Sequence, residues 1–166
     1  MAAPIAFEPP SLQKAWQAFL QHIPVVLLVA VPALYYERGE VVTISVAVQL
    51  LSGRWWRYVL AGLFFSLVTT IGFLLCILPG LAVALVTPVF VNRIFVTEMS
   101  IGEAFANSFQ VVYRSQNGLS FVGLEVLVGI VVGLLALLTC GLGGFVVIPM
   151  ASFFLQNVAY ERVLLR

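Results

Sequence analysis

Apolar residues run through most of the chain in long stretches that charged residues rarely interrupt. The longest stretch, residues 58–92, contains no Asp, Glu, Lys, Arg or His. Because a membrane-spanning helix needs about 20 apolar residues, this stretch is too long for a single span. The pair Pro79–Gly80 near its middle favours a tight corner, since proline interrupts a helix and glycine relieves the backbone at a turn. The pattern predicts two spans, at residues 58–78 and 81–96.

A second apolar hairpin is predicted near the C-terminus. Its spans cover residues 119–138 and 145–160, and the corner between them contains Gly141. Each hairpin also carries a proline within a span, Pro88 in the first and Pro149 in the second. We expect each proline to bend its helix, with the freed carbonyl groups satisfied by neighbouring side chains.

The region before residue 58 allows two interpretations. Residues 11–23 form an amphipathic helix with Trp16 at the membrane–water boundary. They lead into residues 25–36, an apolar segment that is short for a span, with Tyr35 and Tyr36 expected at the headgroups. This segment either spans the membrane as a tilted helix, which we favour, or dips into it and returns. The side on which the N-terminus lies depends on this choice.

Two further segments have the pattern of helices at a membrane surface. Residues 41–52 are too few for a span and carry polar side chains on one face, and residues 100–115 alternate polar and apolar stripes at helical spacing. Between residue 52 and the first hairpin, two indoles flanked by two cations predict a belt at the headgroups. This belt consists of Arg54, Trp55, Trp56 and Arg57.

An internal repeat relates the two hairpins. An ungapped shift of the sequence by 61 residues aligns glycines and prolines, which mark backbone geometry. We infer a duplicated unit, an interfacial helix followed by two spans, at residues 41–98 and 101–166. Two spans per unit give both units the same orientation, a parallel repeat. The aligned pairs are Gly62 and Gly123, Gly72 and Gly133, Gly80 and Gly141, and Pro88 and Pro149.

The composition supports the membrane class. Of the 166 residues, 62% are hydrophobic and 9% are charged, whereas soluble domains carry about 25% charged residues. Together these patterns predict an all-α integral membrane protein with about five transmembrane helices. Four form the two parallel-repeat hairpins and one is a short N-terminal span, with interfacial amphipathic helices between them. The chain is expected to form a single membrane domain, in which residues 11–36 precede the repeat units.

Several function classes receive no support from the sequence. The net charge of +1 gives no basic surface for nucleic acid. Cys76, Cys140 and His22 lack the spacing of a metal site, and we expect no metal and no cofactor. The cysteines fall near the hairpin corners, where buried, unpaired thiols are the more usual state and a disulfide is the alternative. His22 is interpreted as a headgroup contact, and the N-terminus lacks the pattern of a cleaved signal peptide.

Polar residues inside the predicted spans are candidates for function. Glu125 is the single charged residue of the second hairpin, and a carboxylate in a span must be paired, reach the surface or act on protons or ions. We favour an ion pair with Arg93 at similar depth, with a proton- or ion-handling role as the alternative. Gln156 and Asn157 are expected to hydrogen-bond across helices.

Glycines on the spans predict close helix packing. Gly129 and Gly133 form a G-x-x-x-G pattern, which lets another helix approach. Gly123 extends this smooth face, and Gly62 and Gly72 give the first hairpin a similar one. We favour packing within the chain, with a contact to another chain as the alternative.

The cations give the expected orientation. Arginines gather on one side of the four repeat spans, whereas the corners on the other side carry no charge. By the positive-inside rule the arginine side, with the C-terminus, is cytoplasmic. These arginines are Arg54, Arg57, Arg93, Arg114, Arg162 and Arg166.

The sequence GFLLCILPGLAVALVTPVFV at residues 72–91, followed by an amphipathic stretch, resembles a group of bacterial membrane proteins. This group comprises uncharacterised inner-membrane proteins of the YciC type and the membrane domain beside some glycerophosphodiester phosphodiesterases. The resemblance covers residues 59–166. It implies a polytopic helical domain in a prokaryotic inner or internal membrane and supplies no catalytic residues. The residues that carry its second motif are Glu98, Glu103, Ala104 and Ser108.

The sequence favours a non-enzymatic role. Smooth glycine faces, boundary helices and short loops suit an accessory, assembly or scaffold subunit that contacts other membrane chains within the bilayer. A small transporter or channel and a lipid-binding protein are the alternatives. No soluble substrate is evident.

Overall fold

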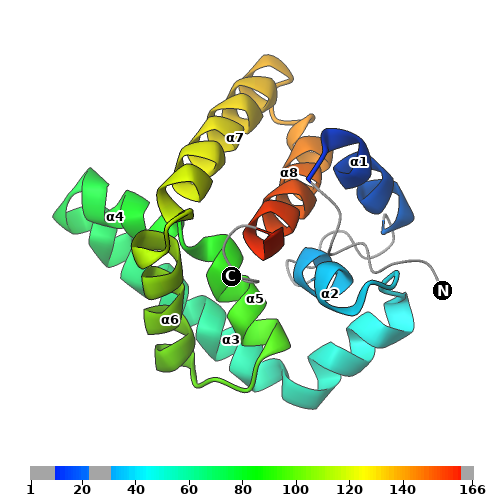
Figure 1. Ribbon diagram of the computed structural model, residues 1–166, viewed down its shortest axis with the longest axis horizontal. Coiled ribbons are helices and arrows are strands. Elements are labelled where there is room, and N and C mark those ends of the chain that lie inside the picture. Colours follow the sequence, from blue (N-terminus) through cyan, green and yellow to red (C-terminus); the bar gives the residue numbers. More distant parts are fainter. Residues whose placement is uncertain (1–9, 23–30, 162–166) are drawn as a thin grey trace.

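The computed structural model describes residues 10–22 and 31–161, arranged as shown in Figure 1. All regular secondary structure in these ranges is helical, which confirms the all-α prediction. Arg162, Arg166 and the first part of the predicted N-terminal span lie outside the described residues. The helices are α1 (Leu12–Gln21), α2 (Val31–Arg38), α3 (Ile44–Leu75), α4 (Ile77–Ala84), α5 (Thr87–Val96), α6 (Ile101–Arg114), α7 (Gly118–Leu138) and α8 (Gly144–Ala159).

Among the described residues, two helices are long and apolar enough to cross a membrane. They are the Ser52–Leu75 part of α3 and the whole of α7. A third crossing is added if α4 and α5, which are bent by 41° at a short break, form one broken span. Helix α8 is apolar but has only 16 residues. Two or three candidate spans are therefore compatible with a membrane protein, fewer than the five expected.

Helix α1 has the expected amphipathic form. Ser11 begins it by accepting a hydrogen bond from the backbone N–H of Lys14 at 3.2 Å, as expected of an N-cap serine. Ala15, Ala18 and Phe19 are buried, and Trp16 is exposed and stacks on Phe19. The apolar face of α1 packs against α8.

Helix α2 differs from the predicted boundary segment. Tyr35 and Tyr36 are buried in the protein, with exposed fractions of 4% and 0%, so the expectation that they contact headgroups is wrong. The rings are buried by tertiary packing, because α2 lies against α5 and α8. These helices remove both rings from the surface.

Helix α3 joins two segments that the sequence analysis separated. It begins at Ile44, capped by the Thr43 hydroxyl, and continues to Leu75. At Arg54 the backbone torsions are non-helical, φ −145° and ψ 31°, so the helix is kinked there. The predicted interfacial segment and the predicted span are thus two parts of one kinked helix, and the arginine–tryptophan belt lies at the kink.

The first hairpin turns three residues earlier than predicted. Its corner is Cys76, whose backbone is extended, and Pro79 and Gly80 lie in the first turns of α4. Proline is tolerated there because the first-turn N–H groups have no helical partner. Gly80 serves packing instead, since a Cβ added to it would lie 2.7 Å from the backbone nitrogen of Phe73 on α3.

The second half of the chain follows the predicted pattern more closely. Helix α6 opens with a reciprocal capping box between Ser100 and Glu103. Helices α7 and α8 meet at a corner in which Cys140 and Gly141 adopt positive φ of 51° and 88°. Gly141 is therefore a turn residue, as expected, and α8 continues through Pro149 without a break.

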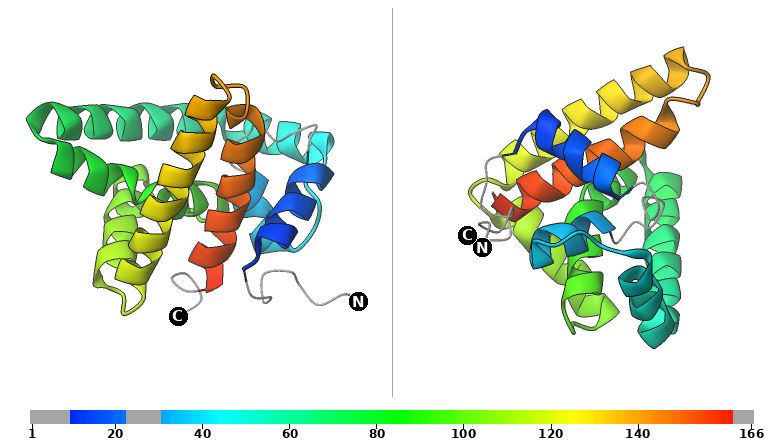
Figure 2. Two further views of the ribbon diagram at one scale, coloured as in Figure 1. Left: turned by 90° about the horizontal axis from the view of Figure 1, so that it is seen from above. Right: turned by 90° about the vertical axis from the view of Figure 1, so that its right-hand side faces the viewer.

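The two apolar hairpins run in different directions. The α3/α4 hairpin lies across the α7/α8 hairpin rather than alongside it (Figure 2). Both corners point away from the loop that joins α5 and α6 (Figure 1). The buried core gathers around α5 and α8, with Val89, Phe121 and Phe153 among its fully buried side chains.

Candidate functional site

The break between α4 and α5 lies in the apolar part of the molecule and is supported by side chains from three helices. Pro88 in the first turn of α5 has no N–H, so it cannot donate to the Ala84 carbonyl four residues earlier. The Thr87 hydroxyl donates to that carbonyl instead. The prediction that Pro88 bends its helix and that neighbours satisfy the freed carbonyl is confirmed.

A second carbonyl at the break is satisfied from another helix. The Val86 N–H donates to Val83 at 3.2 Å, which leaves the Ala82 carbonyl without its usual helical donor. The Tyr113 hydroxyl of α6 donates to this carbonyl at 2.8 Å. Irregular buried backbone needs protein groups to satisfy it, and α6 supplies one such group.

Helix α8 contributes a third hydrogen bond. The Gln156 side chain is 3% exposed and its Nε2 donates to the Pro88 carbonyl at 2.7 Å. The prediction that Gln156 hydrogen-bonds across helices is confirmed. The neighbouring Asn157 is also buried, with its side chain beside the Tyr36 hydroxyl of α2.

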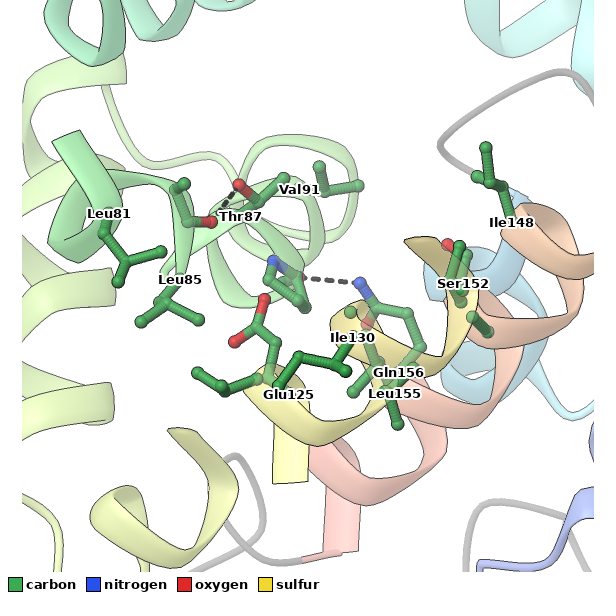
Figure 3. A pocket seen from close by; sticks show the side chains of 17 residues that line it. Leu81, Leu85, Thr87, Val91, Glu125, Ile130, Ile148, Ser152, Leu155 and Gln156 are labelled. Atoms are coloured by element: carbon green, nitrogen blue, oxygen red, sulfur yellow. Dashed lines mark hydrogen bonds between the residues drawn. The ribbon is translucent and has the colours of Figure 1, made fainter. Parts of the chain in front are cut away.

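A cleft of about 560 Å³ opens beside the break, between α4, α5, α7 and α8. The residues at the floor and on the walls of the cleft differ in how exposed they are. Gln156 at the floor is buried, whereas Ile130 and Ile148 on the wall are 55% and 57% exposed. Figure 3 shows Glu125, Gln156 and Thr87 turned toward the middle of this cleft among aliphatic side chains. The cleft therefore combines apolar walls with a small polar floor.

Glu125 enters this cleft from α7 and does not pair with Arg93. Its Oε2 is buried and has no hydrogen-bond partner among the described residues. Arg93 instead donates from Nε to Asn107 Oδ1 of α6 at 2.9 Å. Val91 lines the cleft, and a residue two positions further along a helix points to nearly the opposite side. The predicted Glu125–Arg93 ion pair is wrong for this reason.

Tyr113 is partly buried and lies near Glu125. Burial raises the pKa of this phenol, and the nearby Glu125 carboxylate raises it further. Tyr113 and Thr87 were not among the sequence candidates. A hydroxyl next to a proline within an apolar run is a usable signal for Thr87. For Tyr113 the signal is its place on the aromatic face of α6, four residues after Phe109.

The glycines divide into two groups. A Cβ added to Gly72 would lie 2.9 Å from the Gly80 Cα, so Gly72 makes the predicted close helix approach. For Gly62, Gly123, Gly129 and Gly133, an added Cβ meets no atom within 4 Å in the described part of the chain. Packing within the chain is therefore not what these four glycines serve here. Gly129 lines the cleft.

The belt residues have protein partners. Arg54 pairs with Glu98, and Arg57 donates to the backbone carbonyls of Thr97 and Met99 at 2.9 and 2.6 Å. These contacts tie the kink of α3 to the loop between α5 and α6. Trp55 and Trp56 remain exposed and stack with their ring centroids 4.4 Å apart, as residues at a membrane boundary would.

His22 is a core residue and not a headgroup contact. It is fully buried, with Nδ1 facing the Ala18 carbonyl at 2.7 Å and Nε2 accepting from the Val42 N–H at 2.9 Å. These partners require the neutral ring with its proton on Nδ1. Burial correspondingly lowers the pKa of His22 from 6.5. The expectation failed because α8 covers the ring with Phe153.

The cysteines and metal-ligating groups offer no second site in the described part of the chain. Cys76 and Cys140 are both free and exposed, so the expected burial and the disulfide alternative are both wrong. No group of three or more His, Cys, Asp or Glu side chains is placed to hold a metal ion among the described residues.

Comparison of the chain with protein-family models, with curated proteins and with solved structures finds no match. The resemblance to the YciC-type membrane proteins therefore stays a prediction.

Proposed function

We propose that the protein is a non-enzymatic membrane protein that acts by helix–helix contacts with other membrane chains, as an accessory or scaffold subunit. The observation that carries the proposal is the exposure of its most apolar helices. Only 11% of the most apolar stretch of each candidate span is buried within the chain. These surfaces require lipid or another apolar helix around them.

The glycines of α7 favour a protein partner for part of that surface. Small residues let two helix backbones approach closely in a membrane, where packing and not water exclusion drives association. Gly72 and Gly80 make such an approach between α3 and α4. Gly133 has the same chemistry but no neighbour in the described chain, so we assign it to a contact with a second chain.

Purification in a mild detergent tests this proposal. The full chain is expected to co-purify with a membrane protein in a fixed ratio, or with a second copy of itself. Gly133→Leu should abolish the association, because it fills the space into which a partner helix would fit. Gly102→Leu on α6 is the matched control, since an added Cβ there also meets nothing. An unchanged, monomeric protein in both variants and wild type would contradict the proposal.

We further propose that the protein lies in a prokaryotic inner or internal membrane with its arginine side in the cytoplasm. Arg54, Arg57 and Arg93 are at or near the α5–α6 end of the structure, where they contact residues 97–99 and α6. Cations at one end support a cytoplasmic location for that end. Both hairpin corners point the other way (Figure 1).

The two exposed cysteines at the corners make this orientation testable without mutation. A membrane-impermeant maleimide added to intact spheroplasts should label Cys76 and Cys140, because both corners would face outside. Labelling only after the membrane is opened would reverse the orientation.

A second candidate function is lipid binding, which the cleft beside the helix break favours. Its apolar walls and polar floor have the character of a ligand site. It does not exclude a scaffold role, because Gly133, one turn beyond Gly129 on α7, does not line the cleft.

A further inference from the structure

Two buried oxygen atoms in the cleft have no hydrogen-bond partner within the described structure. They are Oε1 of Gln156 and Oε2 of Glu125. The Gln156 side chain is 97% buried, and its own amide nitrogen is already bound to Pro88. Leaving a buried polar atom unpaired is unfavourable, and such atoms are uncommon in native structures. Both atoms therefore indicate a missing hydrogen-bond donor.

The charge of the cleft limits what that donor can be. Among the described residues that line it, Glu125 is the single ionisable group, and no Lys, Arg or His is present. A phosphate or carboxylate head would lose its hydration in this apolar cleft with no cation to offset the cost. The cleft therefore disfavours anionic heads and accepts a hydroxyl or an amine.

The walls indicate a hydrocarbon chain beyond that head. They are aliphatic, and the side chains toward the opening, including Ile130 and Ile148, are more than half exposed. Glu125 lies seven residues into α7, which corresponds to about 10 Å along the helix axis. A small head at this depth belongs to a molecule whose chain continues along the exposed apolar helices.

The volume of the cleft favours a lipid over a partner helix as its occupant. A helix with side chains is about 10 Å wide and rises about 5.4 Å per turn, so one turn fills on the order of 400 Å³. The cleft, at about 560 Å³, admits little more than one turn. A slender chain fits the same space along its length, and typical ligand sites fall between about 300 and 1,000 Å³.

We propose that this cleft binds one lipid whose small, non-anionic head donates hydrogen bonds to Glu125 Oε2 and Gln156 Oε1. Its occupant is a lipid alcohol or a lipid amine, with the head at the break between α4 and α5 and the chain between α7 and α8. Thr87 and Tyr113 do not contact the head in this arrangement. They hold the backbone of the break, which places the Pro88 carbonyl and so fixes the Gln156 amide.

Native mass spectrometry of the full chain in detergent tests the proposal with three probes that share one chain length: 1,2-dioleoylglycerol, oleylamine and oleic acid. We expect the first two to be retained and oleic acid to be retained at least about tenfold less, the ratio that one hydrogen bond to a charged group supports. Equal retention of all three probes would overturn the proposal.

Variants locate the site. Gly129→Leu should reduce retention of dioleoylglycerol by about tenfold or more, because the added side chain occupies the cleft without touching its polar floor. Gly123→Leu is the matched control on the same helix, outside the cleft, and should bind as wild type. If Gly129→Leu does not fold, Ile148→Trp narrows the opening from an exposed position. Full retention in the folded variants would overturn the site.

The hydroxyl head of dioleoylglycerol and the amine head of oleylamine test the role of the Glu125 carboxyl group. Glu125→Gln keeps an acceptor oxygen and removes the only group among the described lining residues that can ionise against an ammonium, so it should keep dioleoylglycerol and lose its affinity for oleylamine. A photo-crosslinker at Ile130 should capture a photoreactive diacylglycerol. Capture of a protein helix at this position, with no lipid retained, would overturn the assignment of a lipid. Gly133 does not line the cleft, so loss of the partner contact in Gly133→Leu with dioleoylglycerol still retained separates the two proposals.

Discussion

The two apolar hairpins carry aligned glycines and yet differ in how their arms meet. In α3/α4 the backbones nearly touch at Gly72 and Gly80, whereas Gly133, aligned with Gly72, has no neighbour within 4 Å in the described chain. The corners explain the difference. The first hairpin turns at Cys76, before Gly80, while the second turns at Gly141 itself. Of the aligned glycines Gly80 and Gly141, the first is thus a packing residue and the second is a turn residue.

The second arms of the hairpins differ in the same way. The arm that contains Pro88 is broken into α4 and α5, and the arm that contains Pro149 is the continuous helix α8. Gln156 of the continuous arm donates to the Pro88 carbonyl of the broken one. The α3/α4 hairpin thus leads into the helix break, and α8 of the other hairpin supports that break with a hydrogen bond. The cleft lies between the two hairpins.

The largest expected effect comes from the aligned pair Gly72 and Gly133. Gly72→Ala should lower the free energy of unfolding by about 1–3 kcal/mol, because its Cβ meets the Gly80 backbone, which cannot move as a flexible side chain would. Gly133→Ala should raise it by up to about 1 kcal/mol, since alanine favours a helix over glycine where space is open. Unfolding in mixed micelles measures both. Equal effects would remove the distinction between the hairpins.

A smaller effect is expected at the helix break. Thr87→Val keeps the shape of the side chain and leaves the Ala84 carbonyl without a donor, which should lower the unfolding free energy by about 1–2 kcal/mol. Thr70→Val is the control, because Thr70 is exposed in a continuous helix and bonds to the Ser66 carbonyl. A loss as large in Thr70→Val would show that the break needs no special support.

The smallest effect concerns how α8 is anchored. The folded state lowers the pKa of His22 below 6.5, so the unfolded chain binds the proton first. Stability should therefore be complete above pH 6.5 and fall as the pH drops below it, by at most about 1.4 kcal/mol per pH unit. The loss should level off below the folded pKa.

Replacement of His22 provides the control for this pH dependence. His22 is the single histidine of the chain, so the fall in stability between pH 6.5 and 5 should be smaller in His22→Gln than in wild type, whatever the effect on overall stability. Glu98, whose pKa is lowered by its hydrogen bond to Arg54, adds a loss only below its ordinary value of 4.5. The same pH dependence in His22→Gln and in wild type would contradict the neutral, buried ring.

Local patterns in the sequence were sufficient for much of the helical structure. The α6 helix was predictable because its capping box and its stripes are set by residues within one segment. The corner at Cys76 was missed because the sequence pattern treated Pro79 as a helix breaker, although the first turn of a helix accepts proline.

The site depended on contacts that no local pattern contains. Glu125 was identified as unusual from its place in an apolar run, but its partner was not predictable, because the α5 face that Arg93 occupies is set by packing against α6. The burial of His22 and Tyr36 and the crossing of the hairpins depend likewise on how distant segments meet.

The separation of the hairpin corners tests this comparison most directly. Cys76 and Cys140 are the two cysteines of the chain, both exposed and one at each corner. Spin labels on them, measured by double electron–electron resonance in a bilayer, report the distance between the corners. Hairpins that point in different directions predict a distance well beyond the spacing of packed helices. Helices packed side by side lie about 8–10 Å apart, so a narrow distribution within about 20 Å would show parallel hairpins and contradict the open arrangement and its cleft.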